Sequence, residues 1–317
     1  MDRALPPELI ARFRAALDRL GAGSARLGVA VSGGPDSLAL LLLAAQARPG
    51  EVEAATVDHG LRPESADEAA SVARLCEQLG VPHTTLKVTV AAGNLQQEAR
   101  QARYRALADW QAARGLDALL TAHHADDQAE TLLMRLNRGS GLGGLAGVRA
   151  KGRNPVSGGL VLRPLLDWRK AELEALVRDC GIEPVQDPSN RDDRFDRARI
   201  RKSLAAADWL DPPAIAQSAA WLEQAEAALV HYANAEWDAL VGVSESAITY
   251  RPAPETPREI RLRVMARAIA QLGGETRLSQ VAELLDALER GESGNLAGVL
   301  ARATPNGWIF TPEPPRR

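Results

Sequence analysis

The stretch that decides the fold is Ser32-Gly33-Gly34-Pro35-Asp36-Ser37, which joins an apolar segment at 27–31 to a run of leucines and alanines at 38–45. The first segment has the length and β-branched residues of a buried strand, and the second is typical of a buried helix. Two glycines let the backbone of such a turn approach a ligand, while hydroxyls and helix N–H groups add donors. The turn therefore predicts a cradle for an anion, with a phosphate chain as the best match.

The charge of this turn indicates what accompanies the phosphate. No lysine follows the glycines, so the turn is not the Gly-x4-Gly-Lys-Ser/Thr phosphate loop. Asp36 would repel a phosphate unless a cation such as Mg²⁺ lay between them. The turn resembles the pyrophosphate-binding loop of the N-type ATP pyrophosphatases, which cleave ATP between its α and β phosphates. The alternative is a glycine-rich turn without a ligand. The resemblance implies Mg²⁺ at Asp36 and ATP binding by Ser32, Gly33, Gly34, Pro35, Asp36 and Ser37.

Length and composition narrow the class of protein. A chain of 317 residues suggests roughly two domains, which we place at 1–207 and 208–317. The net charge of -3 leaves nucleic-acid binding to a local patch. Cys76 and Cys180 stand far apart, which fits a reducing cytoplasm better than a metal site or a disulfide framework. The first 20 residues are typical of an amphipathic helix and not of a signal peptide. The leucine run at 38–45 is too short to span a membrane. We expect a soluble, cytoplasmic protein.

Strand and helix patterns alternate through the first domain. Such alternation predicts an α/β fold with a doubly wound parallel sheet. In these sheets ligands bind beyond the carboxyl ends of the strands, near the switch in strand order. The segments 32–37, 58–62 and 121–127 all follow expected strands, so they converge there. The expected strands are 27–31, 52–57, 83–90, 117–121 and 160–162, and the expected helices are 38–45, 64–79, 94–114, 125–138 and 169–180.

Two later regions have a different character. Gly139 to Gly144 contains Gly-x-Gly-x-x-Gly but follows a helix, so we expect a flexible loop or lid and no dinucleotide fingerprint. The second domain is expected to be mainly helical, with a short strand and a small hairpin in its tail. Its expected helices are 221–240, 259–272 and 278–289.

Four further motifs carry a closer resemblance. They are Val57-Asp58-His59-Gly60-Leu61-Arg62, Gln101 to Arg105, Thr121 to Thr131 with the Arg-Gly-Ser-Gly at 138–141, and Asp187 to Asn190 with 195–201. In this order they resemble the tRNA(Ile)-lysidine synthetase family. The fold implied is that of the adenine nucleotide α hydrolases. One position departs, because Ala198 stands where the family usually has Asn, and the contact made by that amide is in doubt here.

The resemblance implies a two-step reaction. ATP adenylates the C2 oxygen of the wobble cytidine in an isoleucine tRNA with a CAU anticodon, and pyrophosphate leaves. The side-chain amine of free L-lysine then displaces AMP and gives lysidine. The resemblance leaves the oligomeric state open, with a homodimer as one expectation.

Several side chains suit that chemistry. Arg103 and Arg197 are candidates to stabilise charge at the α phosphate, the alternative being surface salt bridges. Asp127 and Glu130 share a helix face and could bind the lysine amine and accept its proton, or simply complement the helix dipole. His59 is expected near the nucleotide or in the core. For His123 and His124 we favour a structural or substrate-orienting role over metal binding.

The basic stretch at 191–202 has two interpretations, and its charge does not decide between them. It is either a solvated helix face or an arm that binds RNA phosphates. The candidate tRNA-binding residues are Arg191, Arg194, Arg199, Arg201 and Lys202.

Two other functions compete with lysidine formation. A tRNA thiolase of the same superfamily would be expected to carry cysteine pairs, which two isolated cysteines do not provide. A non-catalytic sensor of adenine nucleotides would keep the cradle but would need neither Asp127 and Glu130 nor the basic stretch.

Overall fold

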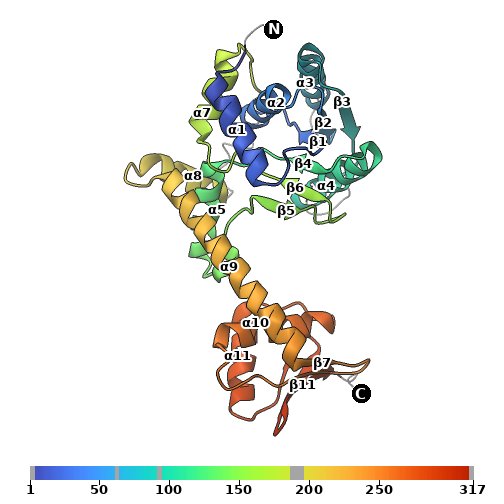
Figure 1. The fold of residues 1–317 in the computed structure, drawn as a ribbon, viewed down its shortest axis with the longest axis vertical. Coiled ribbons are helices and arrows are strands. Elements are labelled where there is room, and N and C mark those ends of the chain that lie inside the picture. The colour runs from blue at the N-terminus through green and yellow to red at the C-terminus, as the bar shows by residue number, and fades with distance from the viewer. Residues whose placement is uncertain (1–3, 61–63, 91–94, 186–195, 314–317) are drawn as a thin grey trace. The chain divides into compact units, whose positions relative to one another are not determined.

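The computed structural model describes residues 4–60, 64–90, 95–185 and 196–313. The chain divides into two compact units, one of residues 1–140 and 144–220 and the other of 141–143 and 221–317. The strands and helices expected for the first unit occur in the predicted order, and a further strand at 151–153 was not expected (Figure 1). Its elements are α1 (Pro7–Arg19), β1 (Leu27–Ala30), α2 (Pro35–Ala47), β2 (Val52–Asp58), α3 (Ser65–Leu79), β3 (His83–Lys87), α4 (Leu95–Arg114), β4 (Ala118–Leu120), α5 (Ala125–Asn137), β5 (Lys151–Arg153), β6 (Leu160–Leu162), α7 (Lys170–Asp179) and α8 (Asp196–Ala206).

A six-stranded sheet forms the centre of this unit, in the order β3-β2-β1-β4-β6-β5. All pairs are parallel except β5–β6, which is antiparallel at the edge. The prediction of a doubly wound α/β sheet is therefore confirmed. Strand order reverses direction between β1 and β4, so the turn after β1 and the segment after β4 meet at the switch point.

Alternating side chains along the strands build two cores. Leu27 and Val29 of β1 pack with α1, α2, α3 and α7 on one face of the sheet. On the other face lies α4, whose Trp110 packs in a second cluster (Figure 1). Gly28 is required there, because a Cβ at this position would lie 2.7 Å from the Trp110 ring. Both cysteines are free and buried in the first core.

The second unit joins helices to an antiparallel sheet that was only partly predicted. The sheet has the order β7-β8-β11-β10-β9. Its five strands include the expected tail hairpin and add β7 and β9, which are three residues each and therefore too short to show a strand pattern in the sequence. Its elements are α9 (Pro212–Leu240), of which residues 212–220 belong to the first unit, β7 (Val241–Val243), β8 (Ile248–Tyr250), α10 (Arg258–Gln271), α11 (Leu278–Glu289), β9 (Gly294–Leu296), β10 (Val299–Thr304) and β11 (Gly307–Pro312).

The glycine-rich segment after α5, expected as a flexible loop or lid, contains a short helix, α6 (Leu142–Leu145). Gly141 and Gly143 pack within the second unit, where an added Cβ would lie 2.8 Å from Leu278 and 2.9 Å from Glu226 respectively. The lack of a side chain at these glycines permits this close packing. Among the described residues, no helix is both long and apolar enough to cross a bilayer.

Candidate active site

The turn between β1 and α2 is closed by hydroxyl hydrogen bonds. The Ser37 hydroxyl accepts from the backbone N–H of Ser32 at 3.1 Å and donates to the Gly34 carbonyl at 2.9 Å. Gly33 has a φ of +83°, and its carbonyl accepts from the Val185 N–H at 2.9 Å. Gly34 is the N-cap of α2 and supplies no side chain to the first N–H groups of that helix. The start of α2 is thus arranged to receive an anion.

A cavity of about 580 Å³ lies over this turn, and we call it the nucleotide cavity. Its volume is within the usual range of small-molecule sites. The walls come from the carboxyl ends of β1, β2 and β4, from α4 and from the starts of α2, α3, α5 and α8. The polar side chains that line it are those of Ser32, Asp36, Ser37, Thr56, His59, Ser65, Glu68, Arg100, Arg103, Tyr104, Thr121, His123, Asp127 and Arg197.

One wall of the nucleotide cavity carries cations of α4. Arg100 donates to the Tyr104 hydroxyl at 2.9 Å. The guanidinium of Arg103 lies 5.5 Å from the centre of the Tyr104 ring, and Arg103 forms no ion pair within the described part of the chain. A guanidinium without a carboxylate partner in such a cavity suits a phosphate oxygen.

The Oδ1 atom of the Asp36 carboxylate is buried and has no hydrogen-bond partner within the described ranges. Such an oxygen is costly unless a cation or a donor meets it. The described residues offer no group of three or more His, Cys, Asp or Glu side chains that could hold a metal. A divalent cation at Asp36 would therefore take its other ligands from a phosphate chain and water, as Mg²⁺ commonly does.

Asp127 and Glu130 lie one turn apart on α5 and are both held by arginines of α8. Arg197 donates to Asp127 Oδ1 at 3.1 Å and to Glu130 Oε2 at 2.7 Å. Arg201 donates to Glu130 Oε1 at 2.6 Å and to Oε2 at 3.2 Å. The Glu130 side chain is only 2% exposed, so its charge depends on these two guanidinium groups.

His124 places a buried imidazole between the phosphate turn and α5. Its Nε2 lies 3.6 Å from Asp36 Oδ2 and 3.4 Å from Asp127 Oδ2. Its Nδ1 lies 3.3 Å from the Asp127 backbone nitrogen, from which it accepts a hydrogen bond that caps α5. Burial lowers the pKa of His124, but the bond to Asp36 and the neighbouring carboxylate charges outweigh it and raise the pKa. The structural role expected for His124 fits this arrangement.

The sequence of this chain matches known proteins along most of its length. Residues 7–207 match the PP-loop domain family. The chain is 49% identical over 312 residues to the tRNA(Ile)-lysidine synthase of Novosphingobium aromaticivorans, covering 96% of this chain and 94% of that protein. The chain belongs to the tRNA(Ile)-lysidine synthase family. The lysidine synthase of Zymomonas mobilis is 41% identical, over 93% of this chain and 90% of that protein.

A solved structure of another protein shares the fold of this lysidine synthase family member. It is the U34-tRNA thiolase NcsA from Methanococcus maripaludis, which superposes with a TM-score of 0.57 over 69% of this chain and 78% of that chain. At 17% identity, this likeness concerns the fold alone.

Most site residues expected from the lysidine synthase motifs come together. Gly33 and Pro35 belong to the phosphate turn. Glu130 accepts hydrogen bonds from Arg197 and Arg201, but neither Glu130 nor Arg201 lines the nucleotide cavity. The expected residues that line the nucleotide cavity are Ser32, Gly34, Asp36, Ser37, His59, Arg103, Asp127 and Arg197.

The candidate tRNA-binding residues of the basic stretch at 191–202 differ in exposure and in their partners. Arg199 and Lys202 are exposed on α8, whereas Arg201 is paired with Glu130. Ala198 is 8% exposed, so the amide usual in lysidine synthases would be buried there and would need partners. The expected tRNA contacts Arg191 and Arg194 lie outside the described residues.

Sequence reasoning missed Arg100 and Tyr104. Together with Arg103 they follow i, i+3, i+4 spacing, the signal that places three side chains on one helix face. That spacing could have extended the candidate set along α4.

Replacement of Gly33 by alanine is expected to destabilise the protein. A Cβ there would lie 3.0 Å from Val185 Cγ2 on backbone with a φ of +83°. The left-handed conformation alone costs an L-residue about 1–2 kcal/mol, and the contact adds to it. Urea denaturation measures the effect. Gly80→Ala is the control, because Gly80 has a φ of +66° with nothing within 4 Å of the added Cβ. Equal losses in the two variants would contradict the packing argument.

His123 is expected to stay neutral above about pH 5. Burial, followed by nearby arginines, lowers the pKa of His123 to about 4, although Asp127 opposes the shift. The unfolded chain then binds more protons than the folded one between about pH 4 and 6.5, so stability falls as the pH drops through that range. NMR titration of the ring protons checks this, with His123→Gln for assignment. Titration near pH 6.5 would contradict it.

Proposed function

We propose that this protein ligates free L-lysine to C2 of the wobble cytidine of an isoleucine tRNA with a CAU anticodon, through an adenylated tRNA. Membership of the lysidine synthase family supports this reaction. The observation that carries it is the nucleotide cavity, which is lined by the phosphate turn, by the carboxylate of Asp127 and by Arg103, a guanidinium without an ion pair among the described residues. That arrangement brings a phosphate cradle and a proton acceptor to the same reacting group.

In the first step the cytidine C2 oxygen attacks the α phosphorus of ATP and pyrophosphate leaves. The N–H groups at the start of α2 and the serine hydroxyls receive the β and γ phosphates. Arg103 and Arg197 line the cavity where charge gathers on the α phosphate, and they donate forked hydrogen bonds to it. Asp36 and the phosphates would hold Mg²⁺, which offsets charge on the leaving pyrophosphate when bound.

In the second step the lysine side-chain amine attacks C2 and AMP leaves. The amine must lose a proton to act as a nucleophile, and we assign this proton to Asp127, a carboxylate that lines the nucleotide cavity. Asp127 is held in position by Arg197 and by the backbone N–H of His124 at 3.2 Å. The low pKa of His123 keeps its ring neutral, so it adds no positive charge to repel the incoming amine.

The tRNA partner is proposed to bind outside this cavity. Arg199 and Lys202 are exposed on α8 and suit backbone phosphates. The region 208–317 is proposed as a tRNA-binding domain that follows the catalytic domain at 1–207. Because the reacting base must leave the stack to enter the nucleotide cavity, the anticodon loop rather than a duplex is the expected substrate.

Product analysis tests the proposal. The purified protein is incubated with ATP, Mg²⁺, a tRNA transcript with a CAU anticodon and L-lysine. AMP and pyrophosphate should form in amounts that depend on both tRNA and lysine, and the tRNA should gain the mass of lysine less water. ATP recovered unchanged would instead indicate a nucleotide sensor, and ADP with phosphate would contradict adenylation.

A further inference from the structure

The turn between α8 and α9 presents Trp209, the most exposed large apolar side chain among the described residues, at 79% exposure. The chain has six tryptophans. Trp221 is 60% exposed, and the other four are at most 7% exposed. A single exposed apolar side chain is ordinary on a protein surface, so the meaning of Trp209 depends on the groups around it.

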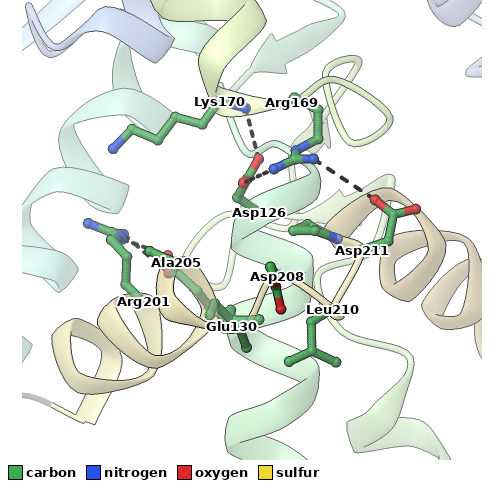
Figure 2. Close-up of a pocket in the computed structure, with 12 residues that line it drawn as sticks. Asp126, Glu130, Arg169, Lys170, Arg201, Ala205, Asp208, Leu210 and Asp211 are labelled. Carbon is green, nitrogen blue, oxygen red and sulfur yellow. Dashed lines mark hydrogen bonds and ion pairs between the residues drawn. The ribbon is translucent and has the colours of Figure 1, made fainter.

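The residues on either side of Trp209 face the other way. Asp208 and Leu210 line a cavity of about 520 Å³ beside α5, shown in Figure 2, and Trp209 does not line it. The turn is closed by a hydrogen bond from the Leu210 N–H to the Ala207 carbonyl at 3.0 Å. The backbone therefore directs the indole away from that cavity and into solvent.

The helix before this turn has two faces with different partners. Arg197 and Arg201 share one face of α8, and both donate to Glu130. By the 3.6-residue period, Arg199 and Lys202 lie on the opposite face, and both are exposed. The outer face of α8 thus carries two cations, and the helix ends three residues before the exposed indole.

Exposed cations followed by an exposed aromatic ring form the combination that binds single-stranded RNA. The cations attract phosphates, and the ring stacks on a base. A protein partner usually covers a contiguous apolar patch instead. The other exposed large apolar side chains described in the first unit, Leu136 and Val156, come from α5 and from the segment between β5 and β6. The chemistry around Trp209 therefore favours a nucleotide.

The course of α8 connects this surface to the reaction. Arg197, at the start of the helix, lines the nucleotide cavity. The helix ends at Ala206, about 14 Å further along its axis at 1.5 Å per residue. An RNA strand that leaves the nucleotide cavity along the outer face of α8 passes Arg199 and Lys202 before it reaches Trp209.

We infer that Trp209 stacks on a base of the single-stranded anticodon loop other than the wobble cytidine, while Arg199 and Lys202 bind the phosphates between the two. This inference rests on the proposed function, which takes the cytidine out of the stack and into the nucleotide cavity. Removal of that base leaves the neighbouring bases without a stacking partner, and an indole outside the cavity replaces the lost contact. Trp209 binds the RNA and takes no part in the chemistry.

The pair Trp209→Leu and Trp209→Phe tests the inference, because leucine keeps an apolar side chain and phenylalanine keeps an aromatic ring. The probe is a fluorescently labelled anticodon stem-loop with a CAU anticodon, and its Kd is measured without ATP. We expect the Kd to rise about tenfold in Trp209→Leu and less than about threefold in Trp209→Phe. Val156→Ala shortens another exposed apolar side chain of the first unit and should keep the wild-type Kd.

Stem-loops that lack the base of one loop nucleotide at a time identify the stacked partner. With the wild type, one position other than the wobble cytidine should weaken binding about tenfold, and with Trp209→Leu the same position should weaken it no further. Such non-additivity reports a direct contact, which a general loss of structure does not produce. Binding of a non-hydrolysable ATP analogue shows that each variant is folded.

Three results would overturn the inference. They are failure of the wild type to bind the stem-loop, equal Kd values for the wild type and Trp209→Leu, and additive losses at every position without a base. A wild-type dimer that Trp209→Leu converts to a monomer would also overturn it, because the indole would then contact a second copy of the chain. The proposed function fails separately, if the wild type forms no adenylated tRNA from ATP and the full-length tRNA.

Discussion

Asp36→Ala is expected to reduce the formation of adenylated tRNA by about 10³-fold, the largest effect predicted for the first step. Asp36 is the carboxylate of the phosphate turn, and its buried Oδ1 has no protein partner within the described residues. Without it, the cation that must accompany a triphosphate loses its protein ligand. Rapid-quench measurement of adenylated tRNA in the absence of lysine gives the rate directly.

A binding measurement separates this effect from unfolding. The wild type should bind a non-hydrolysable ATP analogue more tightly with Mg²⁺ than without it, and Asp36→Ala should show no such difference. Asp67→Ala is the control, since Asp67 is an exposed carboxylate in the first turn of α3 and does not line the nucleotide cavity. If Asp36→Ala formed adenylated tRNA at the wild-type rate, Asp36 of the phosphate turn would have no role in the first step.

The fold of the first unit could be predicted because its signals are local. Strands such as β1 are apolar, and the glycines that end α3 and α7 punctuate the chain where the helices stop. The edge strand β5 was not predicted, because Lys151 to Arg153 has the polarity of a loop and becomes a strand only by pairing with β6. The same holds for β9, whose glycine reads as a turn until β10 supplies the partner.

The site could be predicted only as far as motifs follow strands. Asp36 and Asp127 could be proposed because each lies in the first turn of a helix that follows a strand. The pairing of Arg201 with Glu130 joins residues 71 positions apart and leaves no local pattern. A cavity of about 520 Å³ beside α5 was not predicted for the same reason, since Lys170 and Asp208 line it from separate segments. Tertiary contacts between charged side chains have no sequence period that would reveal them.

Asp127→Ala is expected to let adenylated tRNA accumulate while lysidine formation falls by about 10²–10⁴-fold, the usual range for loss of a general base. Asp127 lines the nucleotide cavity through α5, whereas the phosphate turn that serves the first step belongs to α2. Arg197 loses its bond to Asp127 in this variant but keeps its 2.7 Å bond to Glu130, so the first step keeps its donors. Acid-gel analysis of labelled tRNA distinguishes the adenylated, unmodified and lysine-bearing forms.

The carboxylate also has a structural role, which a second variant separates. Asp127 Oδ2 accepts from the His124 N–H and completes the cap of α5. Asp127→Asn keeps an oxygen for that bond but carries no negative charge to accept a proton, so it should accumulate the same intermediate with α5 intact. Gln280→Ala, which removes a comparable cap from α11, controls for the helix end alone. If Asp127→Asn ligates lysine at the wild-type rate, the charge of Asp127 is not what deprotonates the amine, and the proton must leave by another group.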